Sequence, residues 1–150
     1  MLSHSASRST TSKSDTQDGL GTTLTQLGRS EAIKRNANVT LTLSGGDGWT
    51  LVDAAGATIQ ARPSGEGSRG ASITVSQPSS SLPYSIAFTG LGRMSATTPG
   101  VPVVLSAVDT AGAHCTSAGP RNCLRVDISV GGLIRMCDPA PALLGTPRAC

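Results

Sequence analysis

The cysteines carry the clearest chemistry in this sequence, because they are clustered near its C-terminal end. All four follow residue 114, and they are Cys115, Cys123, Cys137 and Cys150. No pair has the short spacing of a zinc knuckle, and His4 and His114 do not complete a ligand set. Clustered cysteines in a chain rich in Gly, Ser and Thr fit disulfides formed in an oxidising compartment. We therefore expect disulfides, and neither a metal nor another cofactor.

The cysteines can pair in three ways. Sequence-local pairing, Cys115 with Cys123 and Cys137 with Cys150, is favoured because each pair brackets turn residues. The second bridge would pin the proline-rich C-terminal segment to the rest of the protein and stabilise it by about 2–3 kcal/mol.

Patterns that support catalysis are weak. The sequence contains no Gly-x-Ser-x-Gly motif, no phosphate-binding loop and no cluster of His, Asp and Glu. His114 adjoins Cys115, but two such residues adjacent in sequence rarely reach attacking geometry. Asp47 and Asp53 flank a turn, where aspartate commonly acts as a turn former. We predict that the protein is not an enzyme.

The composition indicates a small domain built mainly from strands and turns. The 150 residues include 18 Gly and 9 Pro but only three aromatic residues, so the core must consist of Val, Leu, Ile and Ala. A formal net charge of +3 is far from that of a dedicated nucleic-acid binder.

The chain divides into a polar leader and one domain. Residues 1–19 have no apolar period and predict a flexible leader or the start of a truncated helix region, and residues 20–150 predict a single domain. Leu20, Leu24 and Leu27 form an apolar stripe at helical spacing. We predict a helix that ends near Asn36, a residue suited to a C-terminal stop.

Beyond Val39 the apolar period becomes two, which predicts strands. We predict them near residues 38–44, 48–53, 57–62, 70–77, 84–89, 102–108, 123–130 and 132–137. The glycine pair Gly131-Gly132 is interpreted as a two-residue hairpin loop, with Leu124, Val126, Ile128 and Val130 on one face of the preceding strand. The fold class is therefore α+β.

Two segments together resemble a known family. One is GRSEAIKRNANVTL, residues 28–41, where the predicted helix meets the first strand. The other is the C-terminal end, with NCLRVDIS at 122–129, IRMCDP at 134–139 and PRAC at 147–150. Both are similar to the corresponding segments of type IV pilin-like minor pilins of the FimT/GspH family.

The resemblance implies a pilin-like fold, in which an N-terminal helix packs on a mainly antiparallel body of two small sheets with a disulfide-stapled tail. It implies a minor pilin that joins other minor pilins and the major pilin, and that initiates pilus assembly or sits at the tip. A minor pseudopilin of a type II secretion system is the related alternative. It also implies an inner-membrane anchor and a periplasmic domain. We expect the hydrophobic helix of the full-length protein to precede this sequence.

Some members of the family bind double-stranded DNA during natural transformation, through arginines in a Gly-Arg-x-Arg segment. The corresponding residues here are Gly132-Leu133-Ile134-Arg135, so leucine occupies the first arginine position. The residues that would form a basic patch are Arg135, Arg125, Arg121 and Arg148. Such a patch would bind the DNA backbone without sequence preference. Because of Leu133, we favour an assembly component over a DNA receptor.

Overall fold

The computed structural model describes residues 23–66, 71–77, 81–95, 102–109 and 125–137, together with Gly145 and Pro147. Several predicted features lie outside these residues: the leader 1–19, Leu20, Arg121, Arg148, Cys115, Cys123 and Cys150. In the part of the chain that the structure describes, no helix is long and apolar enough to cross a bilayer.

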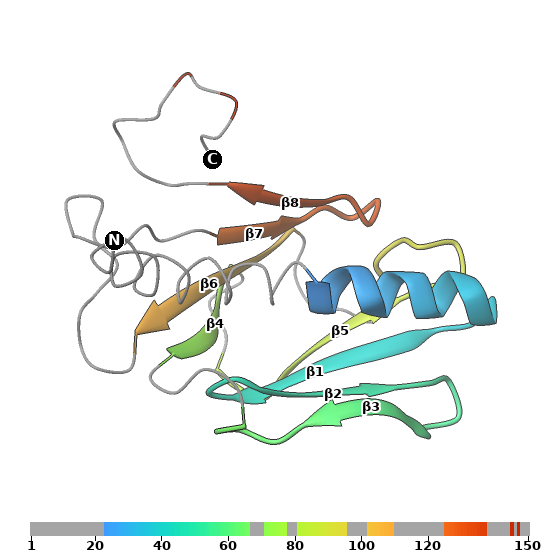
Figure 1. Cartoon of the computed structure of the whole chain (residues 1–150). Coiled ribbons are helices and arrows are strands. Elements are labelled where there is room, and N and C mark those ends of the chain that lie inside the picture. The colour runs from blue at the N-terminus through green and yellow to red at the C-terminus, as the bar shows by residue number, and fades with distance from the viewer. Residues whose placement is uncertain are drawn as a thin grey trace, which may run out of the picture.

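Strands form where the sequence alternates apolar and polar residues. They are β1 (Val39–Gly45), β2 (Gly48–Val52), β3 (Thr58–Arg62), β4 (Ala71–Gln77), β5 (Tyr84–Phe88), β6 (Val103–Asp109), β7 (Arg125–Ile128) and β8 (Ile134–Cys137) (Figure 1). Each of the eight predicted strands is present, with ends within two residues of the prediction.

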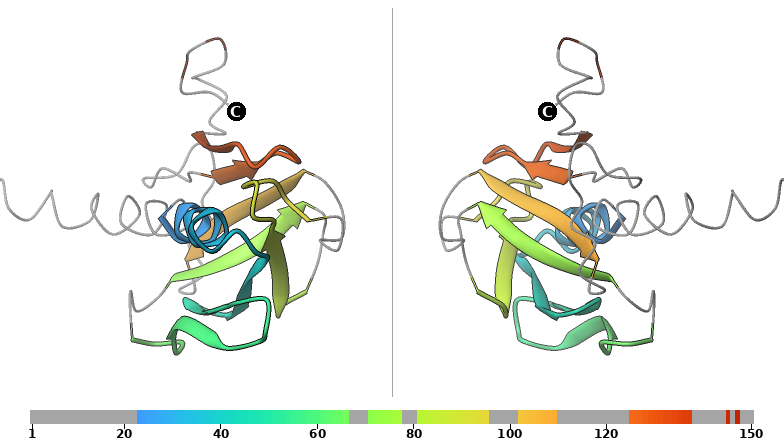
Figure 2. Two further views of the ribbon diagram at one scale, coloured as in Figure 1. Left: turned by 90° about the vertical axis from the view of Figure 1, so that its right-hand side faces the viewer. Right: turned by 90° about the vertical axis from the view of Figure 1, so that its left-hand side faces the viewer.

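Within the described residues, the strands form two antiparallel sheets of four strands each. Sheet A has the order β3-β2-β1-β5, and sheet B has the order β4-β6-β7-β8. Figure 2 views the helix nearly end-on, with the strands of sheet A below it and β7 and β8 of sheet B above it. A backbone hydrogen bond links β4 to the β1–β2 turn, where Ile73 N donates to Gly46 O at 3.0 Å.

The core lies between the sheets and the helix, and β1 shows how the alternating pattern fills it. Leu41 is opposite Leu51 of β2 on one side and Ile86 of β5 on the other. All three side chains are buried, while Thr42, the next residue of β1, is only partly buried. Alternation places successive side chains on opposite faces of the sheet, so one face of sheet A is apolar.

The helix occupies residues 23–35 of the described chain and ends in a Schellman motif. Asn36 has a left-handed φ of 49°. Its N–H donates to Ile33 O at 3.1 Å, and the N–H of Ala37 donates to Ala32 O at 3.2 Å. The predicted stop at Asn36 is therefore confirmed, because these bonds satisfy carbonyls that the helix leaves open.

The helix packs on sheet A through a narrow face of small and apolar residues. Leu24 is 3% exposed and Ala32 is fully buried, while Leu27 is partly buried against the same core. Gly28 lies between them, and a Cβ atom there would be 3.3 Å from two carbons of the Phe88 ring. The glycine thus lets the helix backbone approach the sheet closely.

We predict that Gly28→Val lowers the free energy of unfolding by about 1–3 kcal/mol, as overpacking does in well-filled cores. The new methyl groups would press on Phe88 and on Leu51, whose Cδ1 lies 3.5 Å from the position of the added Cβ. Urea denaturation followed by circular dichroism measures the change. Gln26→Val introduces the same side chain at an exposed position of the same helix, and we expect it to change stability much less.

Candidate assembly surface

The β7–β8 hairpin carries the described part of the predicted basic patch. Arg125 and Asp127 are alternate residues of β7, and their side chains form an ion pair with Nε 3.0 Å from Oδ1. Arg135 lies opposite Asp127 in the register of β8. It is exposed, and its Nη2 donates to Pro147 O at 3.5 Å. Of the two predicted arginines in this hairpin, Arg125 is therefore paired with a carboxylate, which reduces the positive charge of the hairpin.

The turn of this hairpin differs from the predicted two-residue glycine loop. Gly132 N donates to Ser129 O, and Ser129 N donates to Leu133 O, both at 2.9 Å. The centre of the turn is therefore Val130-Gly131, with Gly132 in the left-handed region at φ 85°. The prediction that Val130 shares the buried face of Val126 and Ile128 is wrong, because the turn begins before it and leaves it 55% exposed.

Cys137 ends β8 and is 2% exposed. It forms a disulfide, and its partner cysteine lies outside the described residues. The pairing with Cys150 stays a prediction. A buried bridge at the end of an edge strand would constrain the chain that follows, which suits a structural role.

The loop after β5 has the same turn architecture as the β7–β8 hairpin. Gly92 N donates to Thr89 O, and Thr89 N donates to Arg93 O, both at 2.8 Å. Gly92 also has a left-handed φ, of 77°. Both turns therefore close with two backbone hydrogen bonds and a glycine at the position where other residues would be strained.

These two turns pack against each other and against the helix. Met94 N donates to Val130 O at 3.1 Å, and Arg29 Nε of the helix donates to Gly92 O at 3.1 Å. A Cβ atom on Gly132 would overlap Gly92 O, and one on Gly92 would lie 2.9 Å from Ile33 Cδ1. Figure 1 shows the helix, the 89–94 loop and the β7–β8 turn gathered at one side of the molecule.

An exposed apolar cluster is built on this junction. It consists of Ile33 (49% exposed), Leu91 (79%), Val130 (55%) and Leu133 (68%). The sequence alone does not reveal this cluster, because the four residues come from three segments that meet only in the folded protein. The sequence feature that could have indicated the cluster is a leucine beside glycines in each turn, Gly90-Leu91-Gly92 and Gly131-Gly132-Leu133.

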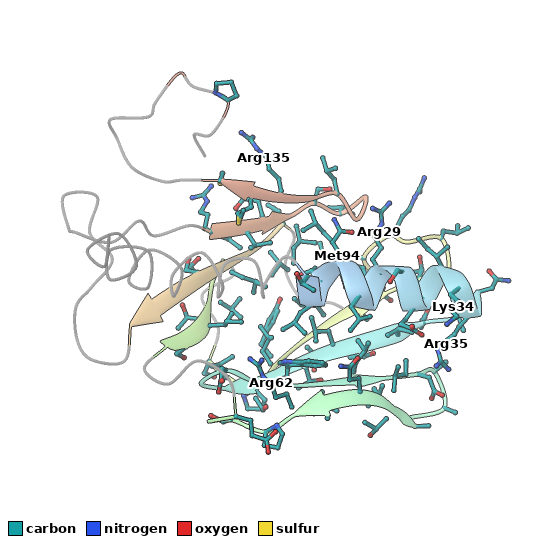
Figure 3. The ribbon with its side chains drawn as sticks, viewed as in Figure 1. Arg29, Lys34, Arg35, Arg62, Met94 and Arg135 are labelled. Carbon is teal, nitrogen blue, oxygen red and sulfur yellow. The ribbon has the colours of Figure 1, made fainter. Side chains whose placement is uncertain are left out.

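Cations border the exposed apolar cluster. Figure 3 shows Arg29 on the side of the helix toward the 89–94 loop and Lys34 at the end of the helix. Arg93 follows Gly92 directly and is exposed, as Lys34 is. Arg35 is compensated by Glu31, whose Oε2 is 3.0 Å from Arg35 Nε, as the four-residue spacing of the two side chains allows.

The described side chains show no constellation of the kind that catalysis requires. Within those residues, no group of three or more His, Cys, Asp or Glu side chains could hold a metal ion. Tyr84 is buried, with 5% of the residue exposed. Burial raises its pKa above the usual value, so it stays protonated at neutral pH and is a poor general base.

A helix packed by a narrow apolar face on antiparallel sheets, with a disulfide-bonded cysteine at the end of the last described strand, defines a pilin-like protein. The family model described as "Type II transport protein GspH" matches residues 22–132. The match spans more than half of the chain, so the chain belongs to this family. A search of curated protein sequences finds no significant match.

The fold is similar to that of the type IV minor pilin FimU of Pseudomonas aeruginosa (strain PAO1), in crystals of two space groups. The first has a TM-score of 0.57 and 16% identity, and the match covers 89% of this chain and 91% of that chain. The second has a TM-score of 0.55 and 16% identity, with 83% and 90% covered. With the family match, the resemblance to FimT/GspH minor pilins and the predicted pilin-like fold class are confirmed. The role remains that of a minor pilin or pseudopilin.

Proposed function

We propose that the protein is a minor pilin of a type IV pilus, a structural subunit of the complex that initiates assembly or sits at the pilus tip. Its partners would be other minor pilins and the major pilin. A hydrophobic helix preceding this sequence would anchor it in the inner membrane with its domain in the periplasm. Family membership and the pilin-like fold support this proposal.

The exposure of Leu133 is the observation that favours assembly over DNA uptake. The resemblance implies that DNA-binding members carry an arginine at this position, whereas here the side chain is leucine and 68% exposed. An exposed leucine contributes to burial against a protein partner and nothing to phosphate binding. The charge of Arg125 is also partly neutralised by its ion pair with Asp127. The hairpin therefore suits contact with another subunit better than contact with a DNA backbone.

Deletion of the gene in the source bacterium tests the proposal. We expect surface pili to become rare by electron microscopy, while secretion of extracellular enzymes stays normal, and a plasmid copy should restore the pili. Normal piliation with lost secretion would instead assign the protein to a type II secretion system, and the pilus proposal would be wrong.

A gel-shift assay with random duplex DNA at low salt tests the alternative. We expect no shifted band at micromolar protein, and no difference between the wild-type protein and Arg135→Ala. A salt-sensitive shift that Arg135→Ala removes would favour the DNA-uptake role.

A further inference from the structure

The exposed apolar cluster gathers nearly all the large apolar side chains on the described surface. Five such residues are strongly exposed, and only Met136 of β8 is not a member of the cluster. Isolated exposed apolar residues are ordinary, but a contiguous group of them usually marks an interaction site. We therefore infer that Ile33, Leu91, Val130 and Leu133 form a contact surface for a binding partner.

The cluster is held rigidly, which lowers the cost of binding. Each of its two turns is closed by a pair of backbone hydrogen bonds of 2.8–2.9 Å. Ser129 Oγ also accepts from Leu133 N at 3.1 Å, and Arg29 ties the 89–94 loop to the helix. Side chains presented on fixed turns lose little backbone entropy on association, so more of their burial contributes to affinity.

The charge beside the cluster indicates the chemistry of the partner. Lys34 and Arg93 are exposed and make no ion pair with any other residue in the described ranges. A partner surface with carboxylates around an apolar centre would complement them. A phosphate backbone would satisfy the cations but would leave the leucines without contacts, so protein is favoured over nucleic acid.

A second copy of this chain does not offer such a surface within the residues described. Four of its carboxylates are already paired with arginines: Glu31 and Asp53 with Arg35, Asp47 with Arg62, and Asp127 with Arg125. Glu66 is exposed, but none of the five strongly exposed large apolar residues lies in its turn. Pairing two clusters symmetrically would place Lys34 and Arg93 against the same cations of the other copy, which is unfavourable. The partner is therefore a different chain.

The position of the cluster fits a neighbouring subunit. Ile33 is near the C-terminal end of the helix, whereas the described part of the helix begins at residue 23. At 1.5 Å per residue the two ends of this described part are about 20 Å apart. In the orientation that the proposed function requires, the membrane anchor precedes the helix, so the cluster faces away from the membrane.

We propose that the exposed apolar cluster, with Lys34 and Arg93 beside it, docks a different pilin subunit through an apolar face flanked by carboxylates. This inference rests on the proposed function and deepens it by assigning the contact surface and the chemistry of the partner.

Binding measurements with defined probes test it. The probes are the purified periplasmic domains of the other pilin-family proteins of the same bacterium, tested one at a time by biolayer interferometry in about 0.1 M salt. We expect one of them to bind, and the double variant Leu91→Ser/Leu133→Ser to weaken that binding at least about tenfold. The variant Lys34→Glu/Arg93→Glu should weaken it comparably and remove most of its salt dependence.

Two matched controls separate the cluster from general surface effects. Met136→Ser removes an exposed apolar side chain outside the cluster, and Gln26→Glu changes the charge of an exposed helix residue. Both should leave the affinity unchanged, and all variants should keep the wild-type melting curve because the altered residues are exposed.

Several results would overturn the inference. The first is that both cluster variants bind with unchanged affinity, and the second is that the wild-type protein binds no pilin domain. The third is that the protein associates with itself and Leu91→Ser/Leu133→Ser abolishes this. The fourth is that it binds phosphatidylglycerol vesicles and the same variant abolishes that binding. If the gene is required for pili but a strain carrying the cluster variant is fully piliated, the docking surface is wrong and the proposed function stands. Normal piliation of the deletion strain removes the proposed function itself.

Discussion

Replacing Phe88 with alanine should lower the free energy of unfolding by about 3–5 kcal/mol, the range measured for large aromatic residues in cores. Phe88 is fully buried and lies opposite Val39 in the register of sheet A. Its ring also packs against the helix at Gly28, and its backbone forms an isolated antiparallel β-bridge with Met94. Truncation would leave a cavity at the point where sheet A, the helix and the 89–94 loop meet.

Urea denaturation of Phe88→Ala beside Leu91→Ala measures this effect. Leu91 lies three residues away and is 79% exposed, so its truncation should change stability by less than about 0.5 kcal/mol. A loss below 1 kcal/mol for Phe88→Ala would contradict the packing of the helix on sheet A.

Asp47→Ala should cost about 3 kcal/mol, because it removes one partner of a buried ion pair. The Asp47 side chain is 4% exposed, and its Oδ2 lies 3.6 Å from Arg62 Nη2. Its Oδ1 accepts a hydrogen bond of 2.7 Å from Gly65 N, so the carboxylate also orders the turn after β3. Without it, Arg62 keeps a partly buried charge and the Gly65 amide loses its acceptor.

A double-mutant cycle with Arg62→Met measures the coupling between the two side chains. We expect Asp47→Ala/Arg62→Met to be less destabilising than the sum of the single variants by at least about 1 kcal/mol. Glu66→Ala removes an exposed carboxylate from the same turn, and it should be nearly neutral. Strict additivity would show that the pair is not energetically coupled.

The strands and the end of the helix were predictable because their signals are local. Val39, Leu41 and Leu43 alternate with threonines, and this alternation is itself the burial pattern of β1. Asn36 terminates the helix through backbone bonds that reach no further than five residues. Patterns of this kind need no knowledge of the rest of the fold.

The surface features depend on contacts between distant segments. Val130 continues the alternation of β7 in sequence, but the turn begins before it and exposes its side chain. The exposed apolar cluster depends on the approach of Gly92 to Gly132, forty residues apart in the chain. The ion pair of Asp47 and Arg62 likewise joins the β1–β2 turn to the end of β3, whereas the sequence indicated only that Asp47 forms a turn.

The distribution of β4 and β5 between the sheets has a consequence for cooperativity. β4 leaves the first three strands to enter sheet B, and β5 returns to pair with β1 in sheet A, so neither sheet is continuous in sequence. If the chain were cut between β3 and β5, the N-terminal fragment would keep β1, β2 and β3 of sheet A, and the edge strand β5 would remain on the C-terminal fragment. No single cut gives two fragments that each contain a complete sheet, because a cut before β5 divides sheet A and a cut after β4 divides sheet B. The described body should therefore fold and unfold in a single all-or-none transition.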